Sequence, residues 1–211
     1  MDATSDSADR RAALKAKSRQ AILEAAAALM HEHRSADFSV DELAAVADVS
    51  RRTVFNHFAS LEDVATEVAG QMLVEVVGRM EAANASREAG TILEDLAATA
   101  SGDQLVPPVA YLIEVLDAED PRQSTREAVL MQRAFALFTD RMSTVIAQRH
   151  PDSDVLTVEL LVAAFGGGLL GLVDRWITAT GGADTPASRR VWDELIASLA
   201  SVLREPDSHA S

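Results

Sequence analysis

Four side chains between residues 51 and 56 have the chemistry to read DNA bases: Arg51, Arg52, Phe55 and Asn56. Arginine suits guanine and asparagine suits adenine in the major groove, and an apolar ring can press on a thymine methyl group. Hydroxyl and imidazole groups that could contact phosphate lie among them, at Ser50, Thr53 and His57. This surface requires an element that presents these side chains to solvent together.

Two short helices joined by a tight turn would position these side chains. The sequence predicts the first helix at residues 40–47, the turn at residues 48–50 and the second helix at residues 51–58. Apolar or small residues recur at helical spacing and predict a shared core at Leu43, Ala44, Ala47, Val54 and Phe58. Ser50 stands where an N-cap is needed, because its hydroxyl can accept from a backbone N–H of the next turn.

The run V-S-R-R-T-V-F-N-H-F-A-S, from Val49 to Ser60, and the following Glu62-Asp63-Val64 resemble the DNA-binding region of TetR-type transcriptional regulators. The match extends upstream through residues 41–44 to a first helix at residues 15–33. The resemblance therefore covers about the first third of the chain. It implies an all-α fold, with an N-terminal three-helix helix-turn-helix domain and a C-terminal helical domain for effector binding and dimerisation.

Three residues depart from the pattern of that family. Asp48 stands where the family usually has glycine, at a turn that needs a left-handed residue, a conformation that aspartate tolerates at some cost. Phe55 replaces a common tyrosine, and Leu61 replaces a lysine that normally meets the DNA backbone. We expect the last two changes to weaken phosphate contact and to leave the fold intact.

The rest of the chain also predicts helices, about nine in all. Of 211 residues, 48% are hydrophobic, and apolar residues recur at helical spacing throughout. Further helices are predicted near 61–80, 87–101, 104–117, 122–149, 153–179 and 186–204. Pro107-Pro108 implies either a kink or a delayed start near Pro108. The predicted domains are a disordered or basic arm (1–14), the helix-turn-helix domain (15–60), the effector and dimerisation domain (61–205) and a tail (206–211).

The net charge of −14 is unusual for a DNA-binding protein, but it is unevenly distributed. Residues 1–60 contain 8 Lys and Arg and 9 Asp and Glu, whereas residues 61–211 contain 11 and 24. Both lysines of the chain, Lys15 and Lys17, lie in the first part, next to Arg10, Arg11 and Arg19. We expect this local basic stretch, and Lys15 and Lys17 in particular, to contact phosphate.

Several functional classes find little support in the sequence. There is no cysteine, no nucleophile motif, no glycine-rich phosphate loop and no cluster of carboxylates and histidines, so we expect neither an enzyme nor a cofactor. The two histidines of His31-Glu32-His33 point apart on a helix, so a solvated helix end is favoured over a metal site. The polar N-terminus carries no secretion signal, and the apolar run at 155–173 favours a buried helix over a membrane span, which indicates a cytoplasmic protein.

The last two predicted helices are candidates for a dimer surface. The helix at 153–179 is apolar nearly all round, which requires burial on more than one side. The candidate interface residues are Leu161, Leu169, Leu172, Trp192, Leu195 and Leu199. Gly166-Gly167-Gly168 and Gly171 favour close helix packing or a helix bend beside a cavity, with a loop or tolerated weak points as the alternative.

An effector site is expected among the middle helices because of the resemblance, with ordinary core packing as the alternative for each residue. Its candidate lining is Tyr111, Leu116, Met131, Phe135, Phe138, Phe165 and Trp176. The sequence therefore predicts a homodimeric regulator of repressor type that binds a near-palindromic double-stranded DNA operator and is released by a small apolar or amphipathic effector. The alternative is a helical ligand-binding or protein-interaction module with weak or lost DNA binding.

Overall fold

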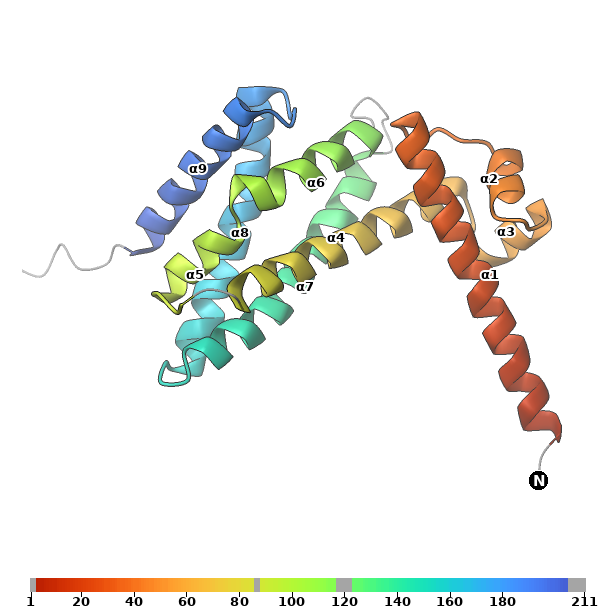
Figure 1. Ribbon diagram of the computed structural model, residues 1–211, viewed down its shortest axis with the longest axis horizontal. Helices are drawn as coiled ribbons and strands as arrows, with labels where there is room; N and C mark the ends of the chain where they lie inside the picture. The colour runs from red at the N-terminus through yellow and green to blue at the C-terminus, as the bar shows by residue number, and fades with distance from the viewer. Residues whose placement is uncertain (1–2, 86–87, 117–122, 205–211) are drawn as a thin grey trace, which may run out of the picture. The chain divides into compact units, whose positions relative to one another are not determined.

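The computed structural model describes residues 3–85, 88–116 and 123–204, and the side chains of residues 12–83, 88–116 and 129–204. Within these ranges the fold is all-α, with nine helices and no strand (Figure 1), which confirms the predicted fold class. The helices are α1 (Ala3–His33), α2 (Val40–Val46), α3 (Arg51–His57), α4 (Leu61–Ala85), α5 (Ile92–Thr99), α6 (Gly102–Leu116), α7 (Gln123–Arg149), α8 (Val155–Thr180) and α9 (Pro186–Arg204).

The chain divides into two compact units. Unit 1 contains Met1–Ala69 and Glu114–Gln123, and unit 2 contains Gly70–Ile113 and Ser124–Ser211. Helices α4 and α6 therefore have residues in both units, and α7 has only its first residue, Gln123, in unit 1. The end of α6 belongs to unit 1 because Arg34 forms an ion pair with Glu114, and the N–H of Ala36 donates to the C=O of Val115 at 2.9 Å.

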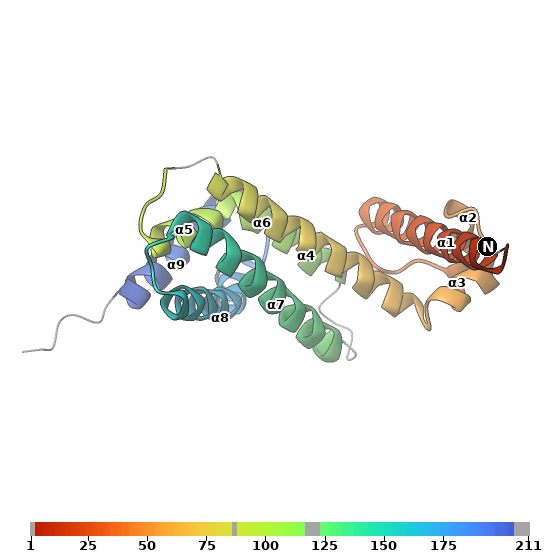
Figure 2. The same cartoon turned by 90° about the horizontal axis from the view of Figure 1, so that it is seen from below.

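Helices α1, α2 and α3 and the first turns of α4 enclose the core of unit 1 (Figure 2). Helix α1 buries an apolar stripe at Ile22, Leu23, Ala26, Leu29 and Met30. Phe38, in the loop after α1, is 5% exposed and lies in this core. The sequence predicted residue 60 as the end of this domain, whereas unit 1 also includes the first turns of α4, where Val64, Ala65 and Val68 are buried.

Helix α1 is longer than the predicted residues 15–33. It begins at Ala3, so the segment expected to be a disordered or basic arm is helical from residue 3 to residue 14. The sequence offers a physical reason, since alanine, leucine, lysine and arginine dominate residues 10–17 and all four favour helices.

Side-chain caps define the starts of α2 and α4, the helices on either side of α3 in the sequence. Ser39 accepts from the N–H of Glu42, whose carboxylate accepts in return from the N–H of Ser39, which closes a capping box before α2. The same arrangement precedes α4, where Ser60 and Asp63 exchange two hydrogen bonds, each at 3.1 Å.

The core of unit 2 lies among α4 to α9, and its largest fully buried side chains are Trp176, Trp192 and Phe165. Helices α8 and α9 run side by side (Figure 1). Trp176 and Trp192 meet edge to face at 5.9 Å between ring centroids. Each indole N–H has a backbone partner: Trp176 donates to the C=O of Ser188 at 3.1 Å and Trp192 to the C=O of Ala100 at 2.8 Å.

The two prolines of α6 do not delay its start. The helix begins at Gly102 and contains both Pro107 and Pro108, so the alternative of a start near Pro108 was wrong. Each proline removes one helical N–H donor. Burial of Leu105, Val106 and Ala110 on the same helix offsets that loss, since all three lie in the core of unit 2.

The glycines of α8 fall into two groups. A Cβ atom at Gly166 would lie 2.8 Å from Cδ1 of Phe138, and one at Gly168 would collide with Leu199 of α9, so these two glycines allow the predicted close packing. A Cβ at Gly171 would meet no atom within 4 Å, and one at Gly167 would meet only Phe135 at 4.0 Å. Close packing within the subunit therefore explains Gly166 and Gly168 and does not explain Gly167 and Gly171.

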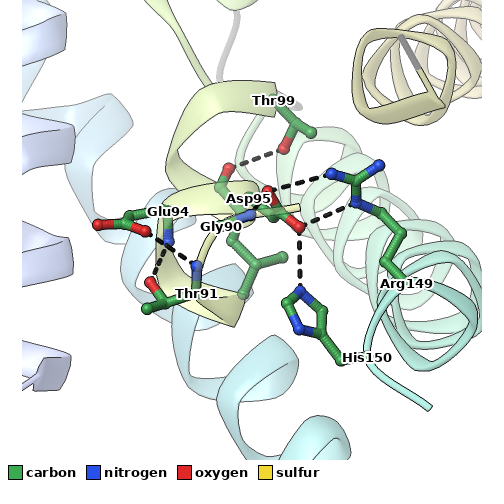
Figure 3. A network of polar contacts seen from close by, with 8 residues as sticks. Gly90, Thr91, Glu94, Asp95, Thr99, Arg149 and His150 are labelled. Atoms are coloured by element: carbon green, nitrogen blue, oxygen red, sulfur yellow. Dashed lines mark hydrogen bonds and ion pairs between the residues drawn. The ribbon is translucent and has the colours of Figure 1, made fainter. Parts of the chain in front are cut away.

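A buried carboxylate joins α5 to the end of α7 (Figure 3). Asp95 is 1% exposed and accepts from Nε of Arg149 at 2.9 Å, from Nε2 of His150 at 3.0 Å and from the N–H of Gly90 at 3.3 Å. Burial alone would raise the pKa of Asp95, but the hydrogen bonds from Arg149, His150 and Gly90 outweigh it and hold the pKa below its usual 3.8.

One helix within the described part of the chain, α8, is long and apolar enough to cross a membrane. Core helices of soluble proteins meet the same criterion of length and composition. Phe165 and Trp176 of α8 are fully buried in the core of unit 2, whereas Leu156 and Leu160 are exposed.

Candidate nucleic-acid interface

The turn between α2 and α3 has the predicted geometry. Asp48 adopts a left-handed conformation with φ of 52°, as expected where the related pattern has glycine. The next N–H, that of Val49, donates to the C=O of Ala44 at 3.0 Å and closes the turn. Ser50 is the N-cap of α3, and its hydroxyl accepts from the N–H of Thr53 at 3.1 Å, which confirms the predicted cap.

Helix α3 buries one side and presents the other to solvent. Val54 is 1% exposed, and Leu43, Ala44, Ala47 and Phe58 are buried with it in unit 1, so the predicted core of the two short helices is confirmed. The predicted base-contacting side chains are all exposed: Arg51, Arg52, Phe55 and Asn56. Phe55 is 51% exposed, so its ring is open to contact with a ligand such as DNA.

The two arginines of α3 differ in their surroundings. Nη1 of Arg51 lies 3.3 Å and 3.4 Å from the carboxylate oxygens of Asp41 in α2. Both side chains are more than 60% exposed, at 63% and 69%, so this ion pair is weak and DNA could displace or share it. Arg52 has no hydrogen bond or ion pair among the described residues, which leaves its guanidinium available to a base edge.

The remaining polar groups of α3 are partly engaged within the protein. The hydroxyls of Ser50 and Thr53 lie 2.8 Å apart and share a hydrogen bond. His57 is half-buried, and burial, followed by the positive charges of Lys15 and Arg19, lowers the pKa of His57 below its usual 6.5. The imidazole is therefore mostly neutral at pH 7 and can offer phosphate an N–H but little charge.

The basic residues predicted to contact phosphate separate into two kinds. Lys15 and Lys17 are exposed on α1. Arg19 instead contacts His57, Phe58 and Glu67 within unit 1. The side chains of Arg10 and Arg11 lie outside the described residues.

The predicted effector-site residues differ in their burial and in the unit to which they belong. Leu116 belongs to unit 1, and the other six belong to unit 2. Phe138, Phe165 and Trp176 are core side chains, at 4%, 0% and 0% exposed, and Phe138 stacks on Phe165 at 6.3 Å. Half-buried positions, which a ligand could reach with less rearrangement, are Tyr111, Met131 and Phe135.

Two of the predicted dimer residues are buried inside the subunit. Trp192 is 1% exposed and Leu169 is 8% exposed, so neither can directly form a surface for a second copy. The other four are half-buried: Leu161, Leu172, Leu195 and Leu199. The predicted dimer residues did not include Leu156 and Leu160, each of which is 60% exposed on α8. The apolar residues all round this helix were the signal in the sequence that could have identified them.

Comparisons with known proteins agree with this geometry. Residues 22–68, which include α2, α3 and the start of α4, match the family of bacterial regulatory proteins called the tetR family. No curated protein matches the chain.

Solved structures resemble nearly the whole chain at low sequence identity. A protein from Mesorhizobium loti assigned to the TetR family has a TM-score of 0.58 at 18% identity, over 89% of this chain and 97% of that one. The TetR family repressor AlkX from Dietzia sp., implicated in biodegradation of n-alkanes, has a TM-score of 0.61 at 16% identity, over 88% and 95%. A transcriptional regulator from Rhodococcus sp. RHA1 has a TM-score of 0.58 at 19% identity, over 90% and 96%. At such identities these structures support the fold alone, and the family match rests on residues 22–68, the part of the chain that is similar to the tetR family of bacterial regulatory proteins.

Proposed function

We propose that the chain acts in the cytoplasm as a homodimeric repressor that binds a near-palindromic operator and is released by a small apolar or amphipathic effector. The proposed DNA binding rests on the solvent-facing side of α3. There Arg52, Phe55 and Asn56 are exposed, while Val54 on the opposite side is buried and Ser50 caps the start of the helix. In this role Arg52 and Asn56 donate to base edges in the major groove, and Phe55 contacts a thymine methyl group or a sugar.

The charge distribution supports binding in one orientation only. Residues 1–60 are close to neutral, whereas residues 61–211 carry most of the negative charge of the chain. Exposed Lys15 and Lys17 would contact phosphate, and the acidic remainder would repel DNA. Binding should therefore weaken steeply as salt increases, because each phosphate contact releases condensed counterions.

A second copy would supply the second reading helix. One seven-residue helix offers too few base contacts for tight specific binding, whereas two helices about 34–36 Å apart would read half-sites one DNA turn apart. The exposed Leu156 and Leu160 of α8 favour this helix as part of the dimer surface, as the family resemblance implies. The effector would act by preferring one of two states with different spacing of the reading helices.

Fluorescence anisotropy with DNA from upstream of the protein's own gene tests the proposal. The wild-type protein should show a sharp, salt-dependent transition, and its solution mass should be that of a dimer. Arg52→Ala should weaken operator binding by about 1–3 kcal/mol. Arg190→Ala is the matched control, since Arg190 is an exposed arginine on α9 and its removal changes the net charge equally.

Two outcomes would contradict the proposal in different ways. Equal operator affinity for Arg52→Ala and Arg190→Ala would remove Arg52 from the reading surface. Absence of any transition at low salt would favour the alternative, a helical ligand-binding module without DNA binding. Three features support this second function because each would weaken DNA contact. Asp41 already pairs with Arg51, and Phe55 and Leu61 replace the tyrosine and lysine that are usual in the family.

A further inference from the structure

A single side chain of α1, that of Arg19, contacts the last residue of α3, the residue that follows α3, and α4. Nη1 of Arg19 donates to the C=O of His57 at 3.1 Å, and Nη2 lies 3.0 Å from Oε2 of Glu67. The guanidinium carbon lies 4.3 Å from the centroid of the Phe58 ring. Three kinds of contact therefore converge on one guanidinium, which is 37% exposed.

The hydrogen bond from Arg19 to His57 gives a donor to a backbone carbonyl at the C-terminal end of α3. His57 is the last residue of α3, and the last carbonyls of a helix have no partner within it. A cation near these carbonyls is favoured both as a donor and by the partial negative charge of the helix end. Because α3 has only seven residues, the fixing of one end constrains the orientation of the whole helix.

The ring of Phe58 holds the guanidinium in place. Phe58 is 5% exposed and packed in the core of unit 1. A guanidinium that lies over such a ring is attracted to its face, and its planar shape suits the contact better than an ammonium group would. The orientation of Arg19 is therefore set by the core and not by solvent.

The contact with Glu67 extends this arrangement to α4. Glu67 lies two residues before Ala69, the last residue of α4 that belongs to unit 1. Both terminal nitrogens of Arg19 are thus engaged, one with α3 and one with α4. This separates Arg19 from Lys15 and Lys17, the exposed basic residues on the same helix.

We propose that Arg19 is a positioning residue for DNA recognition, which orients α3 relative to α1 and α4 and does not itself bind phosphate. The proposal rests on the proposed DNA-binding function and deepens it. Without Arg19, α3 keeps its sequence and its exposed side chains but loses its fixed orientation. Base contacts, which need exact geometry, should then weaken, while the number of phosphate contacts stays the same.

The experiment compares Arg19→Gln with Lys17→Gln, which makes the same charge change on the same helix. Affinity is measured by anisotropy for the operator and for a scrambled duplex over a range of salt concentrations. Arg19→Gln should lose about 5- to 150-fold in operator affinity, the effect of one good base contact, with scrambled-duplex affinity and salt slope unchanged. Lys17→Gln should weaken both duplexes alike and reduce the salt slope by about 1.

Two further variants separate positioning from a role in stability alone. Glu67→Gln leaves Arg19 over Phe58 and should show the same pattern with a smaller loss. Arg19→Lys keeps the charge and a donor and should recover part of the discrimination between operator and scrambled duplex. Circular dichroism confirms that each variant is folded at the temperature of the binding measurement, so a loss of stability alone would leave that discrimination unchanged.

The outcomes distinguish this proposal from the function on which it rests. A wild-type protein that binds no duplex would overturn the proposed function, and the role of Arg19 with it. If the wild type discriminates and folded Arg19→Gln discriminates equally well, only the positioning role is overturned. A uniform loss for both duplexes with a reduced salt slope would make Arg19 a phosphate contact and would also overturn it.

Discussion

Replacement of the buried Asp95 by asparagine should be among the most destabilising single changes on a polar residue of unit 2. The Asp95 side chain is 2% exposed, and its carboxylate contacts Arg149 and His150, whose side chains are each 14% exposed. Asparagine keeps the size of the side chain but removes its negative charge. The positive charge of Arg149 then stays in a largely buried site without the carboxylate that compensates it.

The structure sets the expected magnitude. Removal of one partner from a buried ion pair costs about 3–5 kcal/mol, and the lower end applies because Arg149 retains some contact with solvent. For a chain of this length a loss of 1 kcal/mol lowers Tm by about 2–4 °C, so Asp95→Asn should lower Tm by about 6–12 °C.

The effect of pH on this difference has a definite sign. The pKa of Asp95 is lowered in the folded protein, so its contribution to stability is fully present above the unfolded value of 3.8. The contribution is lost as pH falls through the lower, folded pKa. The difference between wild type and Asp95→Asn should therefore stay constant from about pH 7 to pH 5 and shrink in stronger acid.

Thermal unfolding followed by far-UV circular dichroism measures the change, at one protein concentration because a dimer's Tm depends on concentration. Asp103→Asn is the control: Asp103 forms an ion pair with Arg189 at 2.9 Å but is 83% exposed. Arg189 also keeps Asp184, at 2.7 Å, so the control should cost less than about 1 kcal/mol. Equal Tm values for the two variants would refute the reasoning that burial makes the Asp95 network strong.

The packing and the hydrogen bonds of unit 2 lead to two more predictions, and both are tested by the midpoint of unfolding in urea. Gly166→Ala should destabilise by about 1–3 kcal/mol because its Cβ would lie 2.8 Å from the buried Phe138 ring. Gly78→Ala, in open space on α4, should instead stabilise by up to about 1 kcal/mol, and the same sign for both variants would contradict the packing argument. Trp192→Phe should cost about 1–3 kcal/mol because the C=O of Ala100 loses its indole donor. Trp176→Phe should cost a similar amount through the C=O of Ser188, and wild-type midpoints for both would show that these bonds contribute little.

Features with local causes could be predicted from the sequence. The left-handed Asp48, the Ser50 cap and the Ser60–Asp63 exchange each depend on residues no more than three positions apart. The core stripe of α1 and the buried Val54 follow from helical periodicity. The family pattern then identified which face of α3 carries the candidate contacts, and its DNA binding remains a prediction.

Features that depend on distant partners could not be predicted. Arg19, Lys15 and Lys17 look alike in the sequence, and only the fold brings Arg19 to His57, 38 positions away. The apolar residues of α8 surround the whole helix, so periodicity could not show that Leu169 is buried while Leu156 and Leu160 are exposed. Trp192 was assigned to the dimer surface as an apolar residue of the last predicted helix, and the sequence could not show its burial because its acceptor, the C=O of Ala100, lies 92 positions away.

The passage of α4 and α6 through the division between the two units constrains how such a regulator can be recombined. A single residue inserted after Ala69 would turn the following part of α4 by about 100° and advance it by about 1.5 Å, while α6 kept its original phase. A hybrid that joins the helix-turn-helix unit to another second unit within α4 must therefore keep the number of residues on each side of Ala69 if both parts of this helix are to present their original faces.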